Sequence, residues 1–312
     1  LIMSDNFCPD VLCFGEVLWD LLPDGPVLGG APANLAYRLQ ELGSSVGLIS
    51  RVGADKLGQE ILQTLNGKHL PINLVQTDNE HPTGTVEVTL GPKGDAHYRI
   101  IPEVAYDYIE CDSALLDAAS KCKAICYGTL VQRSLTSRNT LYQILEAASS
   151  ATKLVDINLR KDCFCRDTVH TSLQHANILK LNRDEVIVLS QLLSLNADSP
   201  ESFAKKVIDN YEIALVLVTC GSDGVIAFDD HGLEIHVEGY NVSVVDTVGS
   251  GDNFTAGFLY KLLNGDDLET SCTFGNKVGA LVASKKGGMP LVTIADLNSL
   301  PETTHSRILS NG

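Results

Sequence analysis

The stretch Leu141–Ile157, which reads LYQILEAASSATKLVDI, decides the fold of this chain. Its apolar residues at positions 141, 144, 145 and 148 recur with the spacing of a helix that buries one face. The run Leu154–Ile157 follows, with the length and composition of a buried strand. A helix that leads directly into a buried strand is typical of a βαβ unit, in which a helix joins two parallel strands.

The same alternation extends to both sides of this stretch. Residues 35, 39 and 42 are leucines at helical spacing, and further apolar runs have the length of buried strands. We therefore predict an α/β fold, with a central, mostly parallel sheet flanked by helices. Ligands of such sheets bind at the carboxyl ends of the strands. Besides Leu154–Ile157, strands are expected at Val11–Phe14, Val46–Ile49, Ala124–Tyr127, Ile178–Leu181 and Ala214–Thr219.

Two hairpin patterns interrupt the alternation. Thr85–Leu90 alternates with period two, and His97–Ile101 returns after a turn at Gly91–Asp95, which predicts a small accessory sheet or lid. Gly224–Asp229 and Leu233–Glu238 predict a second hairpin at the edge of the large sheet. After residue 251 the pattern is helical to the end. We expect a single domain over residues 1–312, with the lid inserted at about residues 15–28 and 83–105.

Composition excludes several classes of protein. The chain has 312 residues, with 23 Lys and Arg against 39 Asp and Glu, which gives a net charge of −16. An acidic surface disfavours non-specific nucleic-acid binding and binding to anionic membranes. No apolar stretch reaches the length of a membrane span. The nine cysteines are an odd number in a chain too large to need disulfides, so we expect reduced thiols and a cytoplasmic protein.

The strongest local signal for chemistry is the stretch Asp246–Leu259, DTVGSGDNFTAGFL. Gly249 and Gly251 let the backbone approach a ligand closely, and the helix that follows begins with amide groups that lack intrahelical partners. Such a helix start suits a phosphate group. An ordinary glycine-rich turn before a helix has the same pattern, so this stretch alone leaves both interpretations open. No P-loop and no Gly-x-Gly-x-x-Gly motif after a strand is present.

Five elements in order resemble the pfkB (ribokinase-like) family of carbohydrate kinases. Residues 246–257 resemble the C-terminal signature of that family, and residues 29–36, GGAPANLA, resemble its N-terminal signature. Between them, DINLR at 156–160, NRDE at 182–185 and TCGSDG at 219–224 match the Asp-x-Asn-x-Arg, Asn-x-x-Glu and Thr-x-Gly-x-x-Gly elements. The match runs from about residue 11 to 290, includes the lid, and near residues 14–23 looks most like fructokinases.

The resemblance assigns the catalytic and nucleotide-side residues. It implies that Asp252 is the base that takes the proton from a sugar hydroxyl, and that the backbone of Gly249, Ser250 and Gly251 holds the charge of the γ-phosphate. Arg160 is expected at a strand end, where it meets phosphate or sugar or forms only a surface ion pair. The nucleotide side is expected at Lys180, Thr219, Gly221, Gly224 and Asn276. Taken alone, Thr219 and Gly221 also fit a routine turn, and Asn276 also fits a solvated helix residue.

The same resemblance implies ATP as co-substrate and Mg²⁺ as cofactor. Asn182 and Glu185 resemble the residues that organise Mg²⁺, through water, because Mg²⁺ dehydrates reluctantly. Taken alone, the pair also fits a helix cap with Glu three residues later. Family members also bind K⁺ through carbonyl groups near Asp246 and Val248. Carbonyl ligands have no sequence signature, so the residues leave K⁺ open.

The sugar side is expected near the N-terminal signature. Asp20, Gly30 and Asn34 match positions with which the family holds sugar hydroxyls, and Arg99 lies on the returning strand of the lid. Read alone, Asp20 also fits a turn and Asn34 a helix cap. The lid would exclude water from the site, as transfer to a sugar requires. Lids of this family often pair across a dimer, so a homodimer through the lid is expected.

These expectations together describe an ATP-dependent sugar kinase, with fructose as acceptor and fructose 6-phosphate as product. The alternative acceptors are 2-keto-3-deoxygluconate, ribose or another sugar, because specificity depends on a few pocket contacts. A non-catalytic sugar sensor is the third hypothesis. The carboxylate of Asp252 argues against it, since a silent relative has no need of that group.

Overall fold

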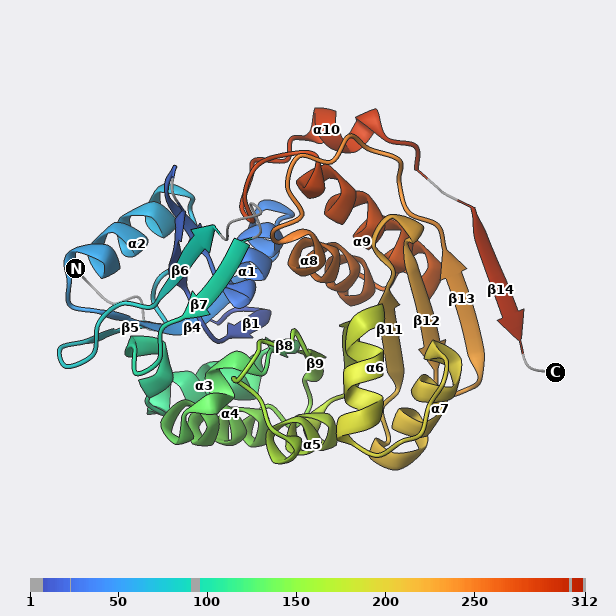
Figure 1. Ribbon diagram of the computed structural model, residues 1–312, viewed down its shortest axis with the longest axis horizontal. Helices are drawn as coiled ribbons and strands as arrows, with labels where there is room; N and C mark the ends of the chain where they lie inside the picture. Colours follow the sequence, from blue (N-terminus) through green and yellow to red (C-terminus); the bar gives the residue numbers. More distant parts are fainter. Residues whose placement is uncertain (1–7, 23, 91–95, 303–304, 311–312) are drawn as a thin grey trace. The chain divides into compact units, whose positions relative to one another are not determined.

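The chain divides into two compact units. The computed structural model describes residues 8–22, 24–90, 96–302 and 305–310. Unit 1 comprises Leu1–Ile125, Val131–Ala151 and Gly287–Met289, and unit 2 comprises Cys126–Leu130, Thr152–Lys286 and Pro290–Gly312 (Figure 1). Neither unit is one continuous segment, so each depends on stretches of chain that are far apart in sequence.

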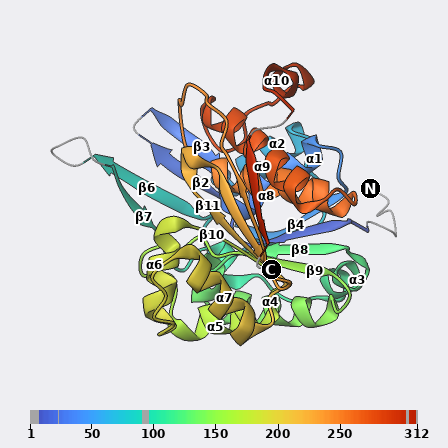
Figure 2. The ribbon, with the colours of Figure 1, turned by 90° about the vertical axis from the view of Figure 1, so that its right-hand side faces the viewer.

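Unit 1 is built on parallel strands covered by helices. β1 pairs in parallel with β4, and β4 pairs in parallel with β5. Figure 2 shows α1 and α2 on one face of these strands and α3 and α4 on the other. The elements in chain order are β1 (Val11–Phe14), β2 (Leu18–Leu22), β3 (Gly25–Gly29), α1 (Ala31–Glu41), β4 (Val46–Gly53), α2 (Lys56–Gly67), β5 (Val75–Asp78), β6 (Thr85–Leu90), β7 (Ala96–Ile100), η1 (Ala105–Tyr108), α3 (Ser113–Lys121) and α4 (Leu135–Ala147). Before α4, β8 (Ala124–Tyr127) and η2 (Leu130–Arg133) each contain residues of both units.

Unit 2 is also an α/β assembly. Its strands lie in the order β14-β13-β12-β11-β10-β9, parallel from β9 to β11 and antiparallel beyond. Figure 2 shows α8 and α9 on one face of these strands and α5, α6 and α7 on the other. The elements are β9 (Thr152–Asp156), α5 (Arg166–His175), β10 (Ile178–Asn182), α6 (Arg183–Leu192), α7 (Pro200–Tyr211), β11 (Leu215–Thr219), η3 (Gly221–Asp223), β12 (Val225–Asp229), β13 (Leu233–Val237), α8 (Ser250–Leu263), α9 (Leu268–Ala283), α10 (Ile294–Ser299) and β14 (Ser306–Ser310).

The predicted α/β fold with a mostly parallel, helix-flanked sheet is confirmed. Strands β1, β6 and β8 have the predicted bounds, and β9 ends at Asp156, one residue earlier than expected. The prediction that the chain is helical after residue 251 is wrong, because β14 follows α10 and forms the edge of the sheet. β13 is therefore not an edge strand, and the second hairpin lies one strand further in than predicted.

The predicted lid is a separate four-stranded sheet in the order β3-β2-β6-β7. The registers align Asp20 with Val86 and Val86 with Ile100, so these three residues share one face of the sheet. The turn predicted at residues 91–95 lies outside the described residues. The homodimer through this sheet stays a prediction.

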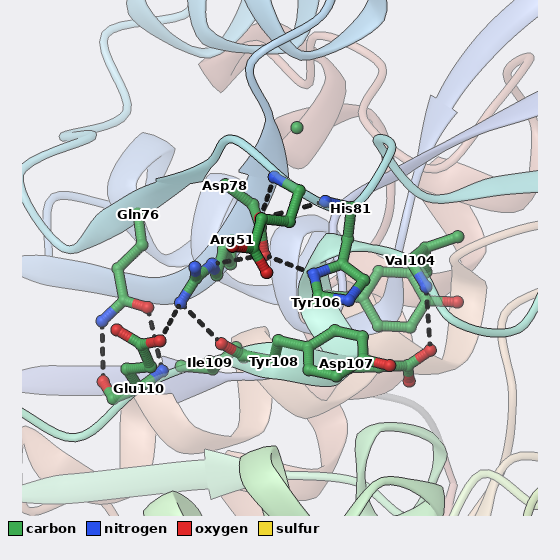
Figure 3. A network of polar contacts seen from close by, with 12 residues as sticks. Arg51, Gln76, Asp78, His81, Val104, Tyr106, Asp107, Tyr108, Ile109 and Glu110 are labelled. Atoms are coloured by element: carbon green, nitrogen blue, oxygen red, sulfur yellow. Dashed lines mark hydrogen bonds and ion pairs between the residues drawn. The ribbon is translucent and has the colours of Figure 1, made fainter.

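The segment that leads into β6 is held by a polar network at the ends of β4 and β5 (Figure 3). Arg51 Nε lies 2.9 Å from Asp78 Oδ2, and Asp78 Oδ1 accepts hydrogen bonds from the amides of Glu80 and His81 at 2.8 and 3.0 Å. The His81 ring stacks on Tyr108, with 3.5 Å between the ring centroids. These contacts fix the chain on the entry side of the small sheet.

Two glycines bring α8 and α9 close together in unit 2. A methyl group in place of the Gly257 hydrogen would lie 3.2 Å from the Gly275 Cα and 3.2 Å from the Phe274 carbonyl oxygen. One at Gly275 would lie 2.9 Å from the ring of Phe254. The helices therefore pack backbone against backbone, which fixes the position of the α8 N-terminus. Within the described part of the chain, no helix has both the length and the apolar character that a bilayer crossing needs.

Candidate active site

The centre of the candidate site is the first turn of α8. Gly249 precedes the helix in the left-handed conformation, with φ of 73°, which only glycine adopts without strain. Asp252 lies in the first helical turn, as predicted. The amides of a first helical turn have no intrahelical acceptor, and Gly251 belongs to that turn. The turn is therefore suited to hold an anion.

Both the amide and the hydroxyl of Ser250 already donate hydrogen bonds within the protein. Its amide donates to the Thr247 carbonyl at 3.2 Å, and its hydroxyl donates to the Gly279 carbonyl on α9 at 3.1 Å. The hydroxyl thus ties the start of α8 to α9. The Ser250 amide would have to exchange its present hydrogen bond for one to a bound anion.

A buried ion pair lies under this turn. Lys180 Nζ lies 2.9 and 3.1 Å from the two carboxylate oxygens of Asp156, and Thr255 Oγ1 donates to Asp156 Oδ2 at 3.2 Å. A methyl group at Gly251 would lie 3.0 Å from Lys180 Nζ, so the ammonium group sits directly against the first turn of α8. Strands β9 and β10 and helix α8 meet at this one charged group.

Lys180 remains charged in its buried position. Burial alone would lower the pKa of its ammonium group, but the adjacent Asp156 carboxylate outweighs burial and raises the pKa above its usual value. The charges of Asp252 and Glu185 act in the same direction, more weakly. By the same attraction, the ammonium group favours negative charge at the α8 N-terminus.

Asp156 and Thr255 are functional candidates to which the sequence motifs assign no role. Asp156 begins the Asp-x-Asn-x-Arg element at residues 156–160. The sequence contains a signal for this pair. Asp156 and Lys180 each place a charge within an apolar strand, and buried charges must be paired. The parallel register of β9 and β10 aligns the two residues.

Asn182 and Glu185 form the capping pair that begins α6. Asn182 Oδ1 accepts from the Glu185 amide at 2.9 Å, and Glu185 Oε2 accepts from the Asn182 amide at 2.8 Å. Glu185 Oε1 also accepts from the Leu159 amide at 2.8 Å, which ties the loop after β9 to α6. Burial raises the pKa of Glu185, and the charge of Asp156 raises it further. Asn182 and Glu185 therefore do cap the start of α6. If they also organise a metal ion, they must do so while they keep these hydrogen bonds.

Arg160 lies in the loop that Glu185 fastens. The prediction that Arg160 ends a strand is wrong, because β9 ends at Asp156, four residues earlier. Arg160 is exposed, and its carbonyl oxygen accepts from the Cys163 amide at 3.0 Å. Asn158 in the same loop has a positive φ of 39°. The loop therefore has a defined backbone that leaves the guanidinium group accessible to solvent.

The remaining nucleotide-side candidates cluster at the carboxyl end of β11 and on α9. Thr219 ends β11 and its hydroxyl donates to the Leu181 carbonyl at 3.2 Å. Gly221 and Gly224 both have positive φ, and a methyl group at Gly224 would lie 2.0 Å from the Val237 carbonyl oxygen. Asn276 is 8% exposed, and its amide nitrogen donates to Val237 and Glu238 at 3.1 and 3.2 Å. The alternative of a solvated helix residue is thus wrong for Asn276.

In unit 1, glycines surround the predicted sugar residues. A methyl group at Gly29 would lie 2.5 Å from Asp20 Oδ2, so the Asp20 carboxylate rests on the Gly29 backbone of the neighbouring strand. Gly30 has φ of 108°, and a methyl group there would lie 2.4 Å from the Glu16 carbonyl oxygen. The buried Glu16 side chain accepts from the Ala31 amide at 3.2 Å and so holds the start of α1.

Asn34 lies within α1, and the helix-cap alternative is wrong. Gly30 is the residue before the helix, and the Asn34 amide donates to its carbonyl at 2.9 Å. The Asn34 side chain is buried, 3% exposed, and it packs against Gly288. Asp20, Gly30 and Asn34 all belong to the same unit, next to the connection between β3 and α1.

Arg99 does not join this group. It aligns with Glu87, which aligns with Leu21, so its side chain projects from the face of the small sheet opposite Asp20. It is 74% exposed and lies 3.2 Å from Glu87 Oε2. The position of Arg99 gives no support to a sugar-binding role.

The chain is similar to known proteins along most of its length. The sequence profile of the pfkB family of carbohydrate kinases matches residues 26–294. This protein therefore belongs to the pfkB carbohydrate kinase family, whose members are phosphotransferases. Fructokinase from Salmonella typhimurium is 31% identical over 301 residues, which cover 89% of this chain and 94% of the relative.

Solved structures agree with the family assignment. Fructokinase from Vibrio cholerae, in its fructose, ADP and calcium-bound form, has a TM-score of 0.80 and 26% identity, with coverage of 94% of this chain and 99% of that one. Ribokinase II from Escherichia coli in complex with ATP and Mg²⁺, described as putative, has a TM-score of 0.77 and 23% identity, and covers 90% and 94%. The second likeness establishes the ribokinase-like fold alone.

Proposed function

We propose that this protein transfers the γ-phosphoryl group of ATP to a hydroxyl group of fructose and so produces fructose 6-phosphate. The observation that carries the proposal is the first turn of α8, where Gly251 and Asp252 lie over the buried ammonium group of Lys180. A carboxylate beside an anion-binding helix start is the arrangement that transfer from a phosphate to an alcohol needs.

The proposed base is Asp252. During transfer, the bond between the γ-phosphorus and the bridging oxygen of ADP breaks, and a bond to the sugar oxygen forms. The proton of the sugar hydroxyl passes to the Asp252 carboxylate, which later releases it to solvent. Catalysis of such a loose transition state consists mainly of positioning and charge stabilisation. A fixed carboxylate in a helical turn is suited to this task.

The proposed anion site uses backbone amides of Gly249, Ser250 and Gly251. Lys180 adds a fixed positive charge beneath them, and the α8 dipole acts in the same sense. This local positive charge is needed because the chain as a whole carries −16 and gives ATP no long-range attraction. Arg160, which is exposed near the same strand ends, is proposed to contact phosphate or sugar.

Mg²⁺ is proposed to act with Asn182 and Glu185. Among the described residues, no group of three or more His, Cys, Asp or Glu side chains is arranged to hold a metal ion directly. Each Glu185 oxygen accepts one backbone amide, and each retains a lone pair that can accept from a metal-bound water. The pair therefore fits a hydrated Mg²⁺ whose other ligands are phosphate oxygens. When bound, the ion neutralises charge on the transferred phosphate.

The sugar is proposed to bind through Asp20, Gly30 and Asn34, and the nucleotide through Thr219, Gly221, Gly224 and Asn276. Asp20 can accept hydrogen bonds from two hydroxyl groups, which suits a polyol. Asn276 already donates from its amide nitrogen, so its side-chain oxygen is the atom left for a ligand. Fructose is chosen as acceptor because the relatives from Salmonella typhimurium and Vibrio cholerae are named fructokinases.

A coupled assay of ADP release tests the proposal. Mg-ATP and K⁺ are supplied with fructose, ribose, 2-keto-3-deoxygluconate or glucose as separate acceptors. Selective turnover of fructose, with the phosphate on carbon 6 by NMR, is the expected result. Turnover of another sugar would retain the mechanism and reject fructose. Silence with every acceptor, in a folded preparation that binds sugar by calorimetry, would support a sensor instead.

A further inference from the structure

A short segment near the C-terminus belongs to unit 1, although the chain on both sides of it belongs to unit 2. This segment, Gly287–Met289, is named here the glycine strap. It follows α9 and precedes α10. The strap therefore carries the chain from the nucleotide-side helices into the unit that holds the proposed sugar residues, and back again.

The strap packs against the side chain of Asn34. A methyl group at Gly288 would lie 2.5 Å from Asn34 Oδ1, 2.6 Å from Nδ2 and 2.7 Å from Cγ. No Cβ atom tolerates such distances, so any residue but glycine would displace the Asn34 amide. Asn34 is only 3% exposed and has little room to yield. Gly287 has φ of 79°, which also favours glycine and sets the direction in which Gly288 approaches.

Lys68 fastens the strap from the end of α2. Its Nζ donates to the Met289 carbonyl at 3.1 Å and lies 4.5 Å from the centre of the Tyr37 ring. Tyr37 lies on α1 three residues after Asn34, so the two are neighbours on that helix. The Tyr37 hydroxyl donates to Glu41 Oε1 at 2.6 Å, which holds the ring in place. One ammonium group thus connects α2, the strap and the helix that carries Asn34.

We propose that the glycine strap, fastened by Lys68, orients the Asn34 amide and thereby sets the affinity of the protein for its sugar. Gly288 and Lys68 are positioning residues that act through Asn34, and the nucleotide site does not depend on them. The inference rests on the proposed function, which puts Asn34 among the sugar ligands. A displaced amide loses its hydrogen bonds to the sugar hydroxyls, so the sugar and not ATP reports the change.

The test compares Gly288→Ala and Lys68→Met with matched controls. Gly67→Ala alters a glycine of α2 with open space around it, and Lys56→Met removes a lysine of α2 that is 88% exposed. For each variant, kcat and the KM values for fructose and ATP are measured, and the fructose Kd is measured by calorimetry without nucleotide. Circular dichroism verifies folding.

The expected result is a split between the two substrates. Gly288→Ala raises the KM and Kd for fructose on the order of 10- to 100-fold, because the displaced Asn34 amide loses hydrogen bonds to the sugar and leaves polar groups unpaired. Lys68→Met raises them about two- to fivefold, as expected for a lost cation–π contact, and Lys68→Arg restores them. The KM for ATP changes by less than about twofold, and both controls match the wild type.

Asn34→Ala separates this inference from the proposed function. If Asn34→Ala raises the fructose Kd while folded Gly288→Ala and Lys68→Met do not, the strap has no positioning role. If Asn34→Ala leaves the fructose Kd unchanged, Asn34 is not a sugar ligand and the inference is overturned with it. Should Gly288→Ala not fold, Lys68→Met and Lys68→Arg decide alone. Equal changes in the KM values for fructose and ATP would mean a general structural role and would also overturn the inference.

Discussion

The two units hold their candidate residues in place by different physical means. In unit 2, the first turn of α8 rests on a buried, charged network of Lys180, Asp156 and Thr255. In unit 1, Asp20 and Asn34 rest on the backbone of Gly29 and Gly288, at distances that exclude any other residue. The candidate residues of unit 2 are fixed by charge pairing, and those of unit 1 by close packing against glycine.

This difference matches the ligand that each unit is proposed to recognise. A phosphate carries concentrated charge, and fixed charges in a medium of low polarity stabilise it strongly. A sugar is neutral and is distinguished by the directions of its hydroxyl groups, so the geometry of a few polar atoms decides specificity. We therefore expect substitutions in unit 2 to affect turnover or folding, and substitutions in unit 1 to affect sugar affinity.

The largest effect is expected from Asp252→Asn, which keeps the shape of the side chain and removes its basicity. Loss of a general base lowers kcat by roughly 10²- to 10⁴-fold. The Kd for ATP should remain close to that of the wild type, because the amides of the α8 turn are unchanged. Steady-state kinetics and calorimetry measure the two quantities. Near-normal kcat would remove Asp252 as the base.

Lys180→Met tests the buried pair of unit 2. Removal of one partner leaves the Asp156 carboxylate buried without its counter-charge, which costs about 3–5 kcal/mol of stability. The control is Lys261→Met, which breaks a pair with Asp266 at 3.3 Å whose side chains are 29% and 32% exposed. That change should cost less than about 1 kcal/mol. Urea unfolding measures the loss of stability in each variant. Equal losses would mean that the buried pair at Lys180 contributes no more to stability than the more exposed pair at Lys261.

Asp20→Ala tests the sugar half. Hydrogen bonds to a charged group contribute about 1.5–3 kcal/mol, so the KM for the sugar should rise roughly 10- to 100-fold while the KM for ATP stays nearly constant. Asp24→Ala, which removes an exposed acid near the turn between β2 and β3, is the control. An equal rise for both substrates would make Asp20 a structural residue.

Glu185→Gln should have the smallest effect on folding stability, and this effect should depend on pH. Since burial raises the pKa of Glu185 above its usual 4.5, the folded protein holds this proton more tightly than the unfolded chain. The resulting stability is fully present below about pH 4.5 and is lost as the pH rises through the folded pKa. The glutamine of the variant does not titrate, so the variant does not lose stability in this way. The free energy of unfolding of the wild type minus that of the variant should therefore decrease between pH 4.5 and 7.5. Urea unfolding at several pH values measures it, and a constant difference would contradict the assignment.

The sequence predicted the fold well because its signals were periodic and local. Buried strands such as β1 and β8 are continuous apolar runs, and the alternation of Thr85–Leu90 identified the small sheet. β14 was missed because its residues, Ser306–Ser310, carry no alternation that distinguishes an edge strand from a tail. Its pairing with β13 is decided by tertiary structure rather than by local preference.

The candidate site was predicted where a motif names the residue. Asp252 and Asn34 lie in elements that the family resemblance identified, and the structure gives their helical positions. The contacts that support them were not predictable in the same way. Gly288 contacts Asn34 across more than 250 residues of sequence, and no local pattern reports such a packing contact. Asp156 and Lys180 were visible as charges in apolar strands, yet only the register of β9 and β10 shows that they pair.

The glycine strap also has a consequence for synthesis of the chain on the ribosome. Residues 8–125 and 131–151 supply almost all of unit 1, but its last piece, Gly287–Met289, is made after most of unit 2. The nascent chain cannot complete the packing around Asn34 until α9 has left the exit tunnel. The proposed sugar half thus matures late even though its sequence comes first, and a ribosome stalled before residue 287 would display a kinase whose Asn34 still lacks its support.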